Sequence, residues 1–386
     1  MATIIYIAGF RQHAGKTFTS LGLISRLREI YKPEQIGYIK PVGQELFTLP
    51  NGRKIDKDAV IIKEFILPTL DMDSVSPVRL GRGVTKKFLS SKRKEEVVEI
   101  YCKSIDDAIK ALSDKEIIIA EGTGHPGVGG IVNLSNSDVS KRLGADIIYL
   151  AGGGIGKTLD MLEVDINYFH SKGARVKGII FNKLIPNKID DMKEYITEDY
   201  LTNRFSKDGT TINILGWIPE IKGLNKPSMR LVKKSFPEAY TPCNTEDKSW
   251  SIPSTGVSIV SRSHKHFNPE EHLKPGNIVI ISSLTLRRLK KIVDYNNNLD
   301  ENSKIAGIIF TCSKLGSILP KSIDLIKENG IPALYVPEDT SSADEILYRC
   351  IKNTKLQSYD NSKNQMIIEA FKNHFDLEKL IKGFIS

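Results

Sequence analysis

The sequence contains little cysteine and no long hydrophobic run. Its 386 residues include 4 cysteines, scattered along the chain without a Cys-x-x-Cys pair: Cys102, Cys243, Cys312 and Cys350. This usage indicates neither a disulfide framework nor a thiolate zinc site. No apolar run approaches the roughly 18 residues that a membrane-spanning helix requires. We therefore expect no membrane segment.

The amino-terminal residues lack a basic region ahead of their apolar run. Residues 1–9 read MATIIYIAG and lead directly into a glycine turn. A secretory signal would place basic residues before a longer apolar stretch. We predict a first β-strand here and expect a cytoplasmic protein.

Charge of either sign is not concentrated in long runs. The 55 lysines and arginines exceed the 46 acidic residues, and the net charge is +9. Basic clusters such as Lys92-Arg93-Lys94 are short, have acids nearby and contain no interleaved aromatics. A groove for single-stranded nucleic acid would combine bases with stacking aromatics. We interpret these bases as solvated surface and expect no nucleic-acid partner.

The chain does contain an alternation of short apolar runs and amphipathic stretches. Apolar strands buried on both faces and separated by helices are typical of a parallel α/β sheet. The predicted first-half strands are residues 4–8, 36–39, 116–120, 147–150 and 176–181, with helices near 16–31 and 95–112. A second α/β series has strands at 257–260, 278–281, 305–310 and 333–336. Further amphipathic helices are predicted at 364–374 and 377–384.

The length of the chain and the change in its composition after about residue 219 predict two domains. We expect a parallel-sheet α/β domain over residues 1–218. Its first strand is followed by a glycine-rich turn that ends in Gly15-Lys16-Thr17, which predicts the P-loop NTPase type. A polar, proline- and serine-rich stretch predicts a linker over 219–254. A second, smaller α/β domain is expected over 255–386.

A glycine-rich turn between the first strand and the first helix is the main functional motif. It reads Gly9-Phe10-Arg11-Gln12-His13-Ala14-Gly15-Lys16-Thr17, with five residues between Gly9 and Gly15 instead of the usual four. Backbone N–H groups of such a loop, with the helix N-terminus, can surround a polyphosphate. Lys16 would reach the β and γ phosphates, and the Thr17 hydroxyl would ligate Mg²⁺. The predicted nucleotide-binding residues here are Gly9, His13, Ala14, Gly15, Lys16, Thr17 and Phe18.

A second Gly-Lys-Thr follows the strand at 147–150. Residues 151–158 read AGGGIGKT, and Ala151 stands where a phosphate loop would need its first glycine. One interpretation is a tight strand-to-helix turn. The other is a site for a substrate anion at the helix N-terminus, formed by Gly154, Ile155, Gly156 and Lys157.

Acidic residues near strand ends are candidate magnesium ligands. Glu121 ends an apolar strand, and the carboxyl ends of parallel strands border the ligand crevice of α/β folds. Asp56 and Asp58 precede an apolar helical run, so each is a helix cap or a metal ligand. Lys40 ends the second strand and is either a second charge for the transferred phosphoryl group or a solvated lysine.

Asn182 follows the strand at 176–181. Its amide can donate and accept toward a purine edge, so we predict a base-contacting role in nucleotide binding.

These motifs, in this order, resemble the dethiobiotin synthetase-like P-loop family. That family's loop has the pattern GTDTxVGKT, with the same five-residue interval, and its Lys-Pro-Val matches Lys40-Pro41-Val42. The resemblance implies acidic metal ligands at Asp56 or Asp58 and at Glu121. It implies that the base-contacting asparagine, with a proline after it, falls on Asn182 and Pro186.

A closer resemblance is to the dethiobiotin-synthetase-like N-terminal part of long bacterial phosphotransacetylases, which continues into a domain named for a DRTGG signature. Matching segments are residues 55–60, 76–78, 133–136 and 216–220, with 305–309, 330–332 and 339–340 in the second domain. Where the signature would lie, this chain has Ser283-Leu284 and Thr311-Cys312-Ser313. No acetyltransferase domain follows before Ser386, so acetyl transfer to coenzyme A is not expected.

The resemblance implies an Mg²⁺- and ATP-dependent enzyme that phosphorylates a carboxylate or carbamate for attack by an amine. Lys16, Lys40 and Glu121 would be catalytic, and Thr17, Asp58 and Glu121 would hold Mg²⁺. The alternative is an ATP-binding regulatory module whose second domain binds a metabolite or a partner. A MinD-like partitioning ATPase would need a lysine early in the loop, where only Arg11 is basic. The resemblance also implies a homodimer acting on a small-molecule substrate or effector.

Overall fold

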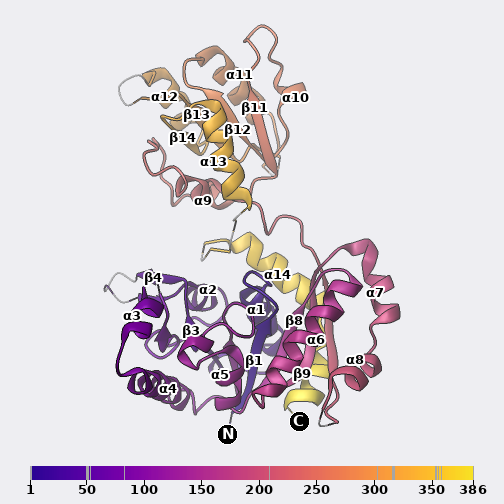
Figure 1. Cartoon of the computed structure of the whole chain (residues 1–386). Helices are drawn as coiled ribbons and strands as arrows, with labels where there is room; N and C mark the ends of the chain where they lie inside the picture. The colour runs from indigo at the N-terminus through magenta and orange to yellow at the C-terminus, as the bar shows by residue number, and fades with distance from the viewer. Residues whose placement is uncertain are drawn as a thin grey trace. The chain divides into compact units, whose positions relative to one another are not determined.

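The chain folds into two compact α/β units, which we call unit 1 and unit 2. The computed structural model describes residues 2–48, 52, 54–81, 83–207, 209–301, 303–314, 318–352, 354, 356–357 and 359–385. Unit 1 comprises Met1–Ile221 together with Asn364–Ser386, and unit 2 comprises Lys222–Lys363. The α/β fold class and the smaller second α/β region are confirmed (Figure 1).

Unit 1 is built on a parallel sheet with the strand order β10-β9-β8-β1-β7-β2. The strands are rich in isoleucine and are buried on both faces, which is typical of parallel sheets covered by helices. Ile7 of β1 lies opposite Glu121 of β7 on one side and Ile148 of β8 on the other. The strands are β1 (Thr3–Gly9), β2 (Ile36–Ile39), β7 (Ile117–Glu121), β8 (Asp146–Ala151), β9 (Arg175–Leu184) and β10 (Asn213–Pro219).

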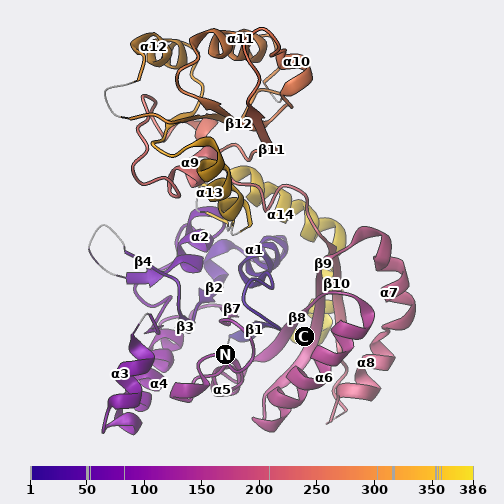
Figure 2. The same cartoon turned by 45° about the horizontal axis from the view of Figure 1, so that its top comes forward.

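Helices cover both faces of this sheet. Figure 2 shows α1 and α14 on one side and α5 and α6 on the other. Buried side chains of α3 to α8 share one apolar cluster with Tyr6 and Ala8 of β1. The helices are α1 (Lys16–Leu27), α2 (Lys57–Phe65), α3 (Val84–Ser90), α4 (Lys94–Lys110), α5 (Asn136–Arg142), α6 (Ile155–Ser171), α7 (Ile189–Tyr195) and α8 (Glu198–Phe205).

Short elements between β2 and α3 border the carboxyl edge of the sheet. β3 pairs with β6 in parallel, and β4 pairs with β5 as an antiparallel hairpin that leads into α2. Asp56 ends the hairpin and caps α2, because its carboxylate accepts a hydrogen bond from the Asp58 N–H. The elements are β3 (Val42–Gly43), β4 (Leu46–Thr48), β5 (Lys54–Asp56) and β6 (Val78–Arg79), with the 3₁₀ turns η1 (Pro33–Gln35), η2 (Gly130–Val132) and η3 (Pro186–Lys188).

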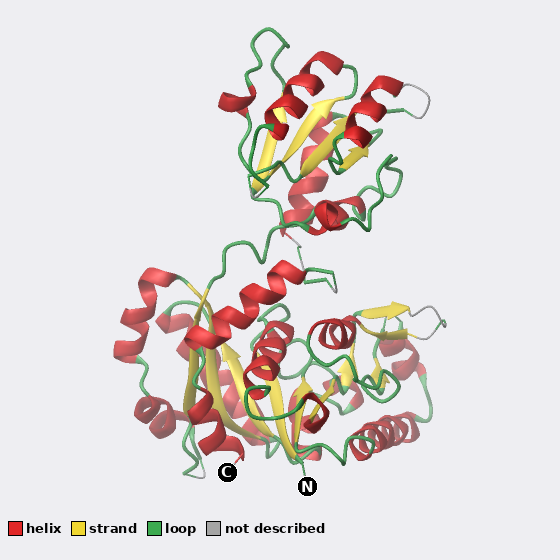
Figure 3. Ribbon diagram, turned by 180° about the vertical axis from the view of Figure 1, so that it is seen from behind, coloured by secondary structure: helices red, strands yellow, loops and turns green. Residues whose placement is uncertain are grey.

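Unit 2 contains a second parallel sheet with its strands in chain order (Figure 3). Side chains of α11 and α12, with Phe267 and Leu273 on either side of α10, are buried against one face, and those of α9, η4 and α13 against the other. The strands are β11 (Gly256–Val260), β12 (Asn277–Ser282), β13 (Gly307–Thr311) and β14 (Ala333–Tyr335). The helices are α9 (Met229–Lys233), η4 (Lys248–Ser251), α10 (Pro269–His272), α11 (Leu286–Asn297), α12 (Pro320–Glu328) and α13 (Thr340–Lys352).

The chain returns to unit 1 after residue 363, which differs from the expected second domain over 255–386. The returning elements are α14 (Asn361–His374), α15 (Leu377–Leu380) and the π-helical turn η5 (Ile381–Ile385). Phe371 of α14 is fully buried, and its ring centroid lies 5.4 Å from that of Phe18 in α1. The Asp376 N–H donates to the Leu215 carbonyl of the edge strand β10 at 2.8 Å. Residues 364–386 therefore complete unit 1.

The predicted linker over 219–254 also differs from the structure. Residues 222–254 belong to unit 2, where they form α9 and η4. Their apolar side chains Met229, Val232 and Trp250 are buried against its sheet. The residues between these three side chains are mostly polar, which is why the composition resembles that of a linker. A few large apolar side chains are nevertheless enough to hold such a segment against a sheet.

Candidate functional site

The glycine loop joins β1 to α1 in a tight turn. Gly9 ends β1 and Lys16 begins α1, as the sequence predicts. Gly15 has a φ of 103°, and a Cβ there would lie 2.3 Å from Nδ2 of Asn182. Only glycine combines that left-handed backbone with so close an approach. His13 also has a positive φ, of 64°, within the turn.

Two residues near the end of β9, Asn182 and Lys183, hold the glycine loop by hydrogen bonds. Nδ2 of Asn182 donates to the Ala14 carbonyl, and Nζ of Lys183 donates to the His13 carbonyl, both at 2.9 Å. Oδ1 of Asn182 accepts from the Lys183 N–H at 2.9 Å. Asn182 is buried, and its side-chain amide contacts the backbone of the glycine loop. Contact with a base stays a prediction.

The Lys16 side chain lies beneath the loop. Its Nζ donates to the carbonyls of Arg11 at 3.1 Å and Gly124 at 2.8 Å. Burial, with a further effect from the nearby Lys40 charge, lowers the pKa of Lys16 to about 8. An anion bound beside this ammonium would raise that pKa again, so the lysine is suited to phosphate.

Glu121, at the end of β7, is the centre of the polar network. Its Oε1 accepts from Thr17 at 2.9 Å and from Lys40 at 2.8 Å. Its Oε2 accepts from Ser20 at 2.8 Å and from Tyr38 at 2.9 Å. The side chain is fully buried, and burial raises its pKa against the opposing effect of Lys40.

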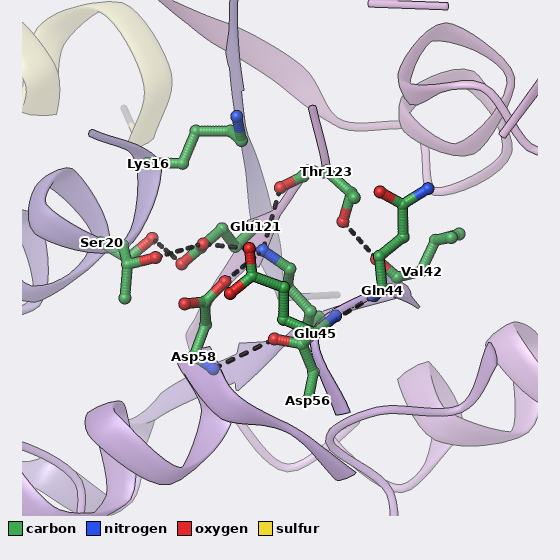
Figure 4. A network of polar contacts seen from close by, with 12 residues as sticks. Lys16, Ser20, Val42, Gln44, Glu45, Asp56, Asp58, Glu121 and Thr123 are labelled. Carbon is green, nitrogen blue, oxygen red and sulfur yellow. Dashed lines mark hydrogen bonds and ion pairs between the residues drawn. The ribbon is translucent and has the colours of Figure 1, made fainter. Parts of the chain in front are cut away.

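The structure separates the roles of Asp56 and Asp58. Besides capping α2, Asp56 accepts from the Gln44 N–H at 3.0 Å, so backbone groups hold its carboxylate. Asp58 points the other way and accepts from Nζ of Lys40 at 2.7 Å. Burial raises the pKa of Asp58, but the Lys40 charge and the hydrogen bonds to the carboxylate together lower that pKa below its usual range. Figure 4 shows Asp58 close to Glu121, with Asp56 at the backbone.

Lys40 is buried between the two carboxylates and is not a solvated surface lysine. Its Nζ also donates to the Gly122 carbonyl at 3.1 Å. Burial alone would lower the pKa of Lys40, but Asp58 and Glu121 raise it well above its ordinary value. The group therefore carries a permanent positive charge next to the candidate metal ligands.

The donor set suits magnesium. Thr17, Asp58 and Glu121 offer only oxygen atoms, and Thr17 and Lys40 both hydrogen-bond the same Glu121 oxygen. Within the described ranges no group of three or more His, Cys, Asp or Glu side chains could hold a metal. Mg²⁺ commonly uses one or two carboxylates and completes its shell with water and substrate phosphates. The residues present therefore fit Mg²⁺ bound together with a nucleotide.

The second Gly-Lys-Thr forms the start of α6. Gly154 is its N-terminal cap, and the Thr158 N–H donates to the Gly154 carbonyl at 3.0 Å. Gly154, Gly156 and Lys157 are exposed, and Ile155 is half-buried. A Cβ at Gly152 would lie 2.5 Å from the Asn182 carbonyl, so this turn borders the loop-supporting residues. An anion site here stays a prediction, as does phosphate contact by Phe18, whose ring packs on Phe371.

Two residues of the network were not anticipated from the sequence: Ser20 and Tyr38. Ser20 lies three residues after Thr17, and Tyr38 two residues before Lys40. The periodicity of a helix therefore places Ser20 on the same face as Thr17. The periodicity of a strand places Tyr38 on the same face as Lys40. This spacing could have identified Ser20 and Tyr38, but only with the knowledge that Glu121 faces both α1 and β2.

A parallel sheet whose first strand ends in a glycine loop, with a lysine and a threonine opening the next helix, defines a P-loop NTPase fold. The family described as "AAA domain" (AAA_26) matches residues 3–228. The chain belongs to this family.

The chain is also similar to two named enzymes. An ATP-dependent dethiobiotin synthetase from Clostridium perfringens (strain 13) is 28% identical over 231 residues, which are 58% of this chain and 92% of that enzyme. A phosphate acetyltransferase from Synechocystis is 20% identical over 225 residues, which are 57% of this chain and 29% of that enzyme. The predicted family resemblance is therefore confirmed.

Among solved structures, the MinD cell division protein of Aquifex aeolicus is 12% identical, with a TM-score of 0.36. The match covers 58% of this chain and 84% of that protein. None of the helices in the described part of the chain combines the length and apolar character needed to cross a membrane.

Proposed function

We propose that the chain is an Mg²⁺- and ATP-dependent enzyme that phosphorylates a carboxylate or carbamate. The observation that carries the proposal is the convergence of Lys16, Lys40, Asp58 and Glu121 at the mouth of the phosphate loop. Two lysines and two carboxylates gathered around one loop, with only Asp58 partly exposed, can neutralise a transferred phosphoryl group and hold its metal. The similarity to a dethiobiotin synthetase supports this reaction class.

The proposed reaction needs positioning and charge more than a dedicated base. The acceptor oxygen bonds to the γ-phosphorus of ATP as the bond to ADP breaks, giving a mixed anhydride. An amine then attacks the carbonyl carbon, and phosphate leaves. Lys16 and Lys40 would face the negative charge on the phosphoryl oxygens. Gly154, Ile155, Gly156 and Lys157 would receive a substrate anion.

Magnesium would supply charge neutralisation of the phosphates when bound. Thr17, Asp58 and Glu121 are the residues that would hold it. Asn182 would contact the base. Asp56 is assigned to capping α2 and has no direct role in the proposal.

A regulatory ATP-binding module is the second candidate, and unit 2 favours it. The aligned region already takes up 92% of the dethiobiotin synthetase. That enzyme therefore has no counterpart of the size of residues 222–363. A unit of this kind would bind a metabolite or a partner and respond to the nucleotide state.

The test is ADP release from Mg·ATP by the purified chain, with and without bicarbonate, across a panel of amines and carboxylates. We expect acceptor-dependent turnover that falls at least about 100-fold in Lys16→Ala and Glu121→Ala. Lys110→Ala, which removes an exposed lysine at the end of α4, is the matched control and should keep full activity. Tight ATP binding without turnover under any condition would rule out the enzyme and leave the regulatory candidate.

A further inference from the structure

The loop after β7 connects the two lysines of the site. Its Gly124 carbonyl accepts from Lys16, and its Gly122 carbonyl accepts from Lys40. The Thr123 hydroxyl donates to the Val42 carbonyl in the segment after Lys40. The position of residues 122–126 therefore determines where both ammonium groups can lie.

Asn136, the first residue of α5, holds this loop with every polar group of its side chain. Its Oδ1 accepts from the Thr123 N–H and from the Tyr6 hydroxyl, both at 2.9 Å. Its Nδ2 donates to the carbonyls of Thr123 at 2.8 Å and His125 at 2.6 Å. The Asn136 N–H donates to the Pro126 carbonyl at 3.0 Å.

The amide orientation is fixed by these partners. The Thr123 N–H can only donate and the two carbonyls can only accept, so the reverse orientation would oppose like groups. Asn136 is buried, and a Cβ at Gly122 would lie 2.4 Å from its Oδ1. Burial raises the pKa of Tyr6, so its hydroxyl remains a donor.

Tyr6 extends the connection to the strand that carries the glycine loop. It lies in β1, three residues before Gly9. Asn136 thus joins β1, the loop after β7 and the start of α5 through buried hydrogen bonds. Buried polar networks with every group satisfied are rigid, and a single lost partner is costly.

We infer that Asn136 is a positioning residue for the γ-phosphate side of the site. This inference rests on the proposed function, since it concerns how the two lysines meet the transferred phosphoryl group. The side chain acts through the loop carbonyls and does not itself touch the nucleotide. The backbone cradle for the other phosphates lies between Gly9 and Thr17, outside the residues to which the Asn136 side chain is hydrogen-bonded.

The experiment compares Asn136→Asp with wild type. Asn136→Asp keeps the shape but replaces two N–H donors by an oxygen that faces two carbonyls. We expect Mg·ATP affinity and turnover to fall about tenfold or more, and ADP affinity to fall by a smaller factor, because Lys16 also reaches the β-phosphate. Hydrogen exchange should speed up at the amides of residues 122–125 in the free protein. Tyr6→Phe, which removes one bond only, should show the same pattern more weakly.

Ser137→Ala is the matched control for damage to α5. Ser137 is equally buried, and its hydroxyl donates a long hydrogen bond of 3.4 Å to the Phe169 carbonyl. It should leave the ratio of ATP to ADP affinity unchanged. Equal losses of ATP and ADP affinity in Asn136→Asp, or no loss of either, would overturn the inference. Failure of the wild-type chain to bind Mg·ATP would instead overturn the proposed function.

Discussion

At the scale of single residues, the site is a set of charges that compensate one another, buried apart from the partly exposed Asp58. Lys40 lies between Asp58 and Glu121, and Glu121 accepts hydrogen bonds from three hydroxyl groups as well. Removing one member of such a set leaves an uncompensated buried charge. Lys16 differs, because its partners in this structure are neutral carbonyls and burial lowers its pKa. The two lysines should therefore respond differently to pH.

Nucleotide affinity is predicted to fall with rising pH because of Lys16. Its pKa is about 8 in the free protein, and a bound diphosphate raises it, so above pH 8 binding must take up a proton. Calorimetry with ADP and a chelator, from about pH 7 to pH 9.5, should show weaker binding, approaching about tenfold per pH unit at the alkaline end. Lys16→Ala should bind weakly and show no such slope. An equal slope in that variant would refute the assignment.

Tyr38→Phe is predicted to weaken metal use without weakening nucleotide binding. The substitution removes one of the two donors to Oε2 of Glu121 and so holds that oxygen less firmly. Hydrogen-bond partners of metal ligands commonly affect metal affinity by about tenfold or more. The Mg²⁺ concentration for half-maximal turnover should rise accordingly, with ADP affinity in chelator unchanged. Tyr149→Phe, whose hydroxyl donates to Asp165 of α6 away from Glu121, is the control and should match wild type.

At the scale of elements, the contact between α1 and α14 fixes the helix that carries Lys16 and Thr17. Gly22 lies where the Phe371 ring meets α1, and a Cβ there would be 2.0 Å from a ring carbon. Glycine is normally unfavourable inside a helix, by about 1 kcal/mol relative to alanine. The close approach of the ring explains its presence at this position.

Gly22→Ala is therefore predicted to destabilise unit 1 by about 1–3 kcal/mol, despite the better helix propensity of alanine. Phe371→Ala should cost about 3–5 kcal/mol through the cavity left by a fully buried ring. The pair Gly22→Ala with Phe371→Leu should be more stable than the sum of the single changes predicts. Urea unfolding checks this. Strictly additive effects would contradict the proposed packing.

The sequence pattern predicted those parts of the site that are recognisable within a short stretch of the chain. The glycine loop, Lys40 and Glu121 are each fixed by a strand end next to a glycine or a turn, and the structure brings them together. The choice between Asp56 and Asp58 was not decidable from the sequence. It depends on how the β4–β5 hairpin presents α2, which is a tertiary feature.

At the scale of the whole chain, unit 2 is inserted between β10 and the carboxyl-terminal segment of unit 1. The sequence could not show this insertion. The apolar pattern of the helix predicted at 364–374 does not indicate which of the two sheets that helix packs against. Each unit contains one of the chain's 2 tryptophans, Trp217 in unit 1 and Trp250 in unit 2. Trp217 stacks on Phe181 with ring centroids 4.3 Å apart, so it reports on the core of unit 1.

Removing residues 364–386 is predicted to unfold unit 1. The segment buries Phe371, Phe375, Leu380 and Phe384, each worth about 1.5–3 kcal/mol, against a domain stability of about 5–15 kcal/mol. In a Trp250→Phe background, the truncated chain should lose the cooperative transition of Trp217 fluorescence. Lys372→Ala, which alters an exposed residue of α14, should keep it. A truncated chain that retains this transition would show that unit 1 folds without the segment.

The insertion also orders events during biosynthesis. Residues 364–386 leave the ribosome only after the whole of residues 222–363, so the nascent unit 1 waits with the outer side of α1 and the β10 edge uncovered. An exposed edge strand and an apolar helix face are the features that chaperones recognise and that drive misassembly. Slow translation through residues 222–363 would lengthen that exposure, and a rapid passage would shorten it.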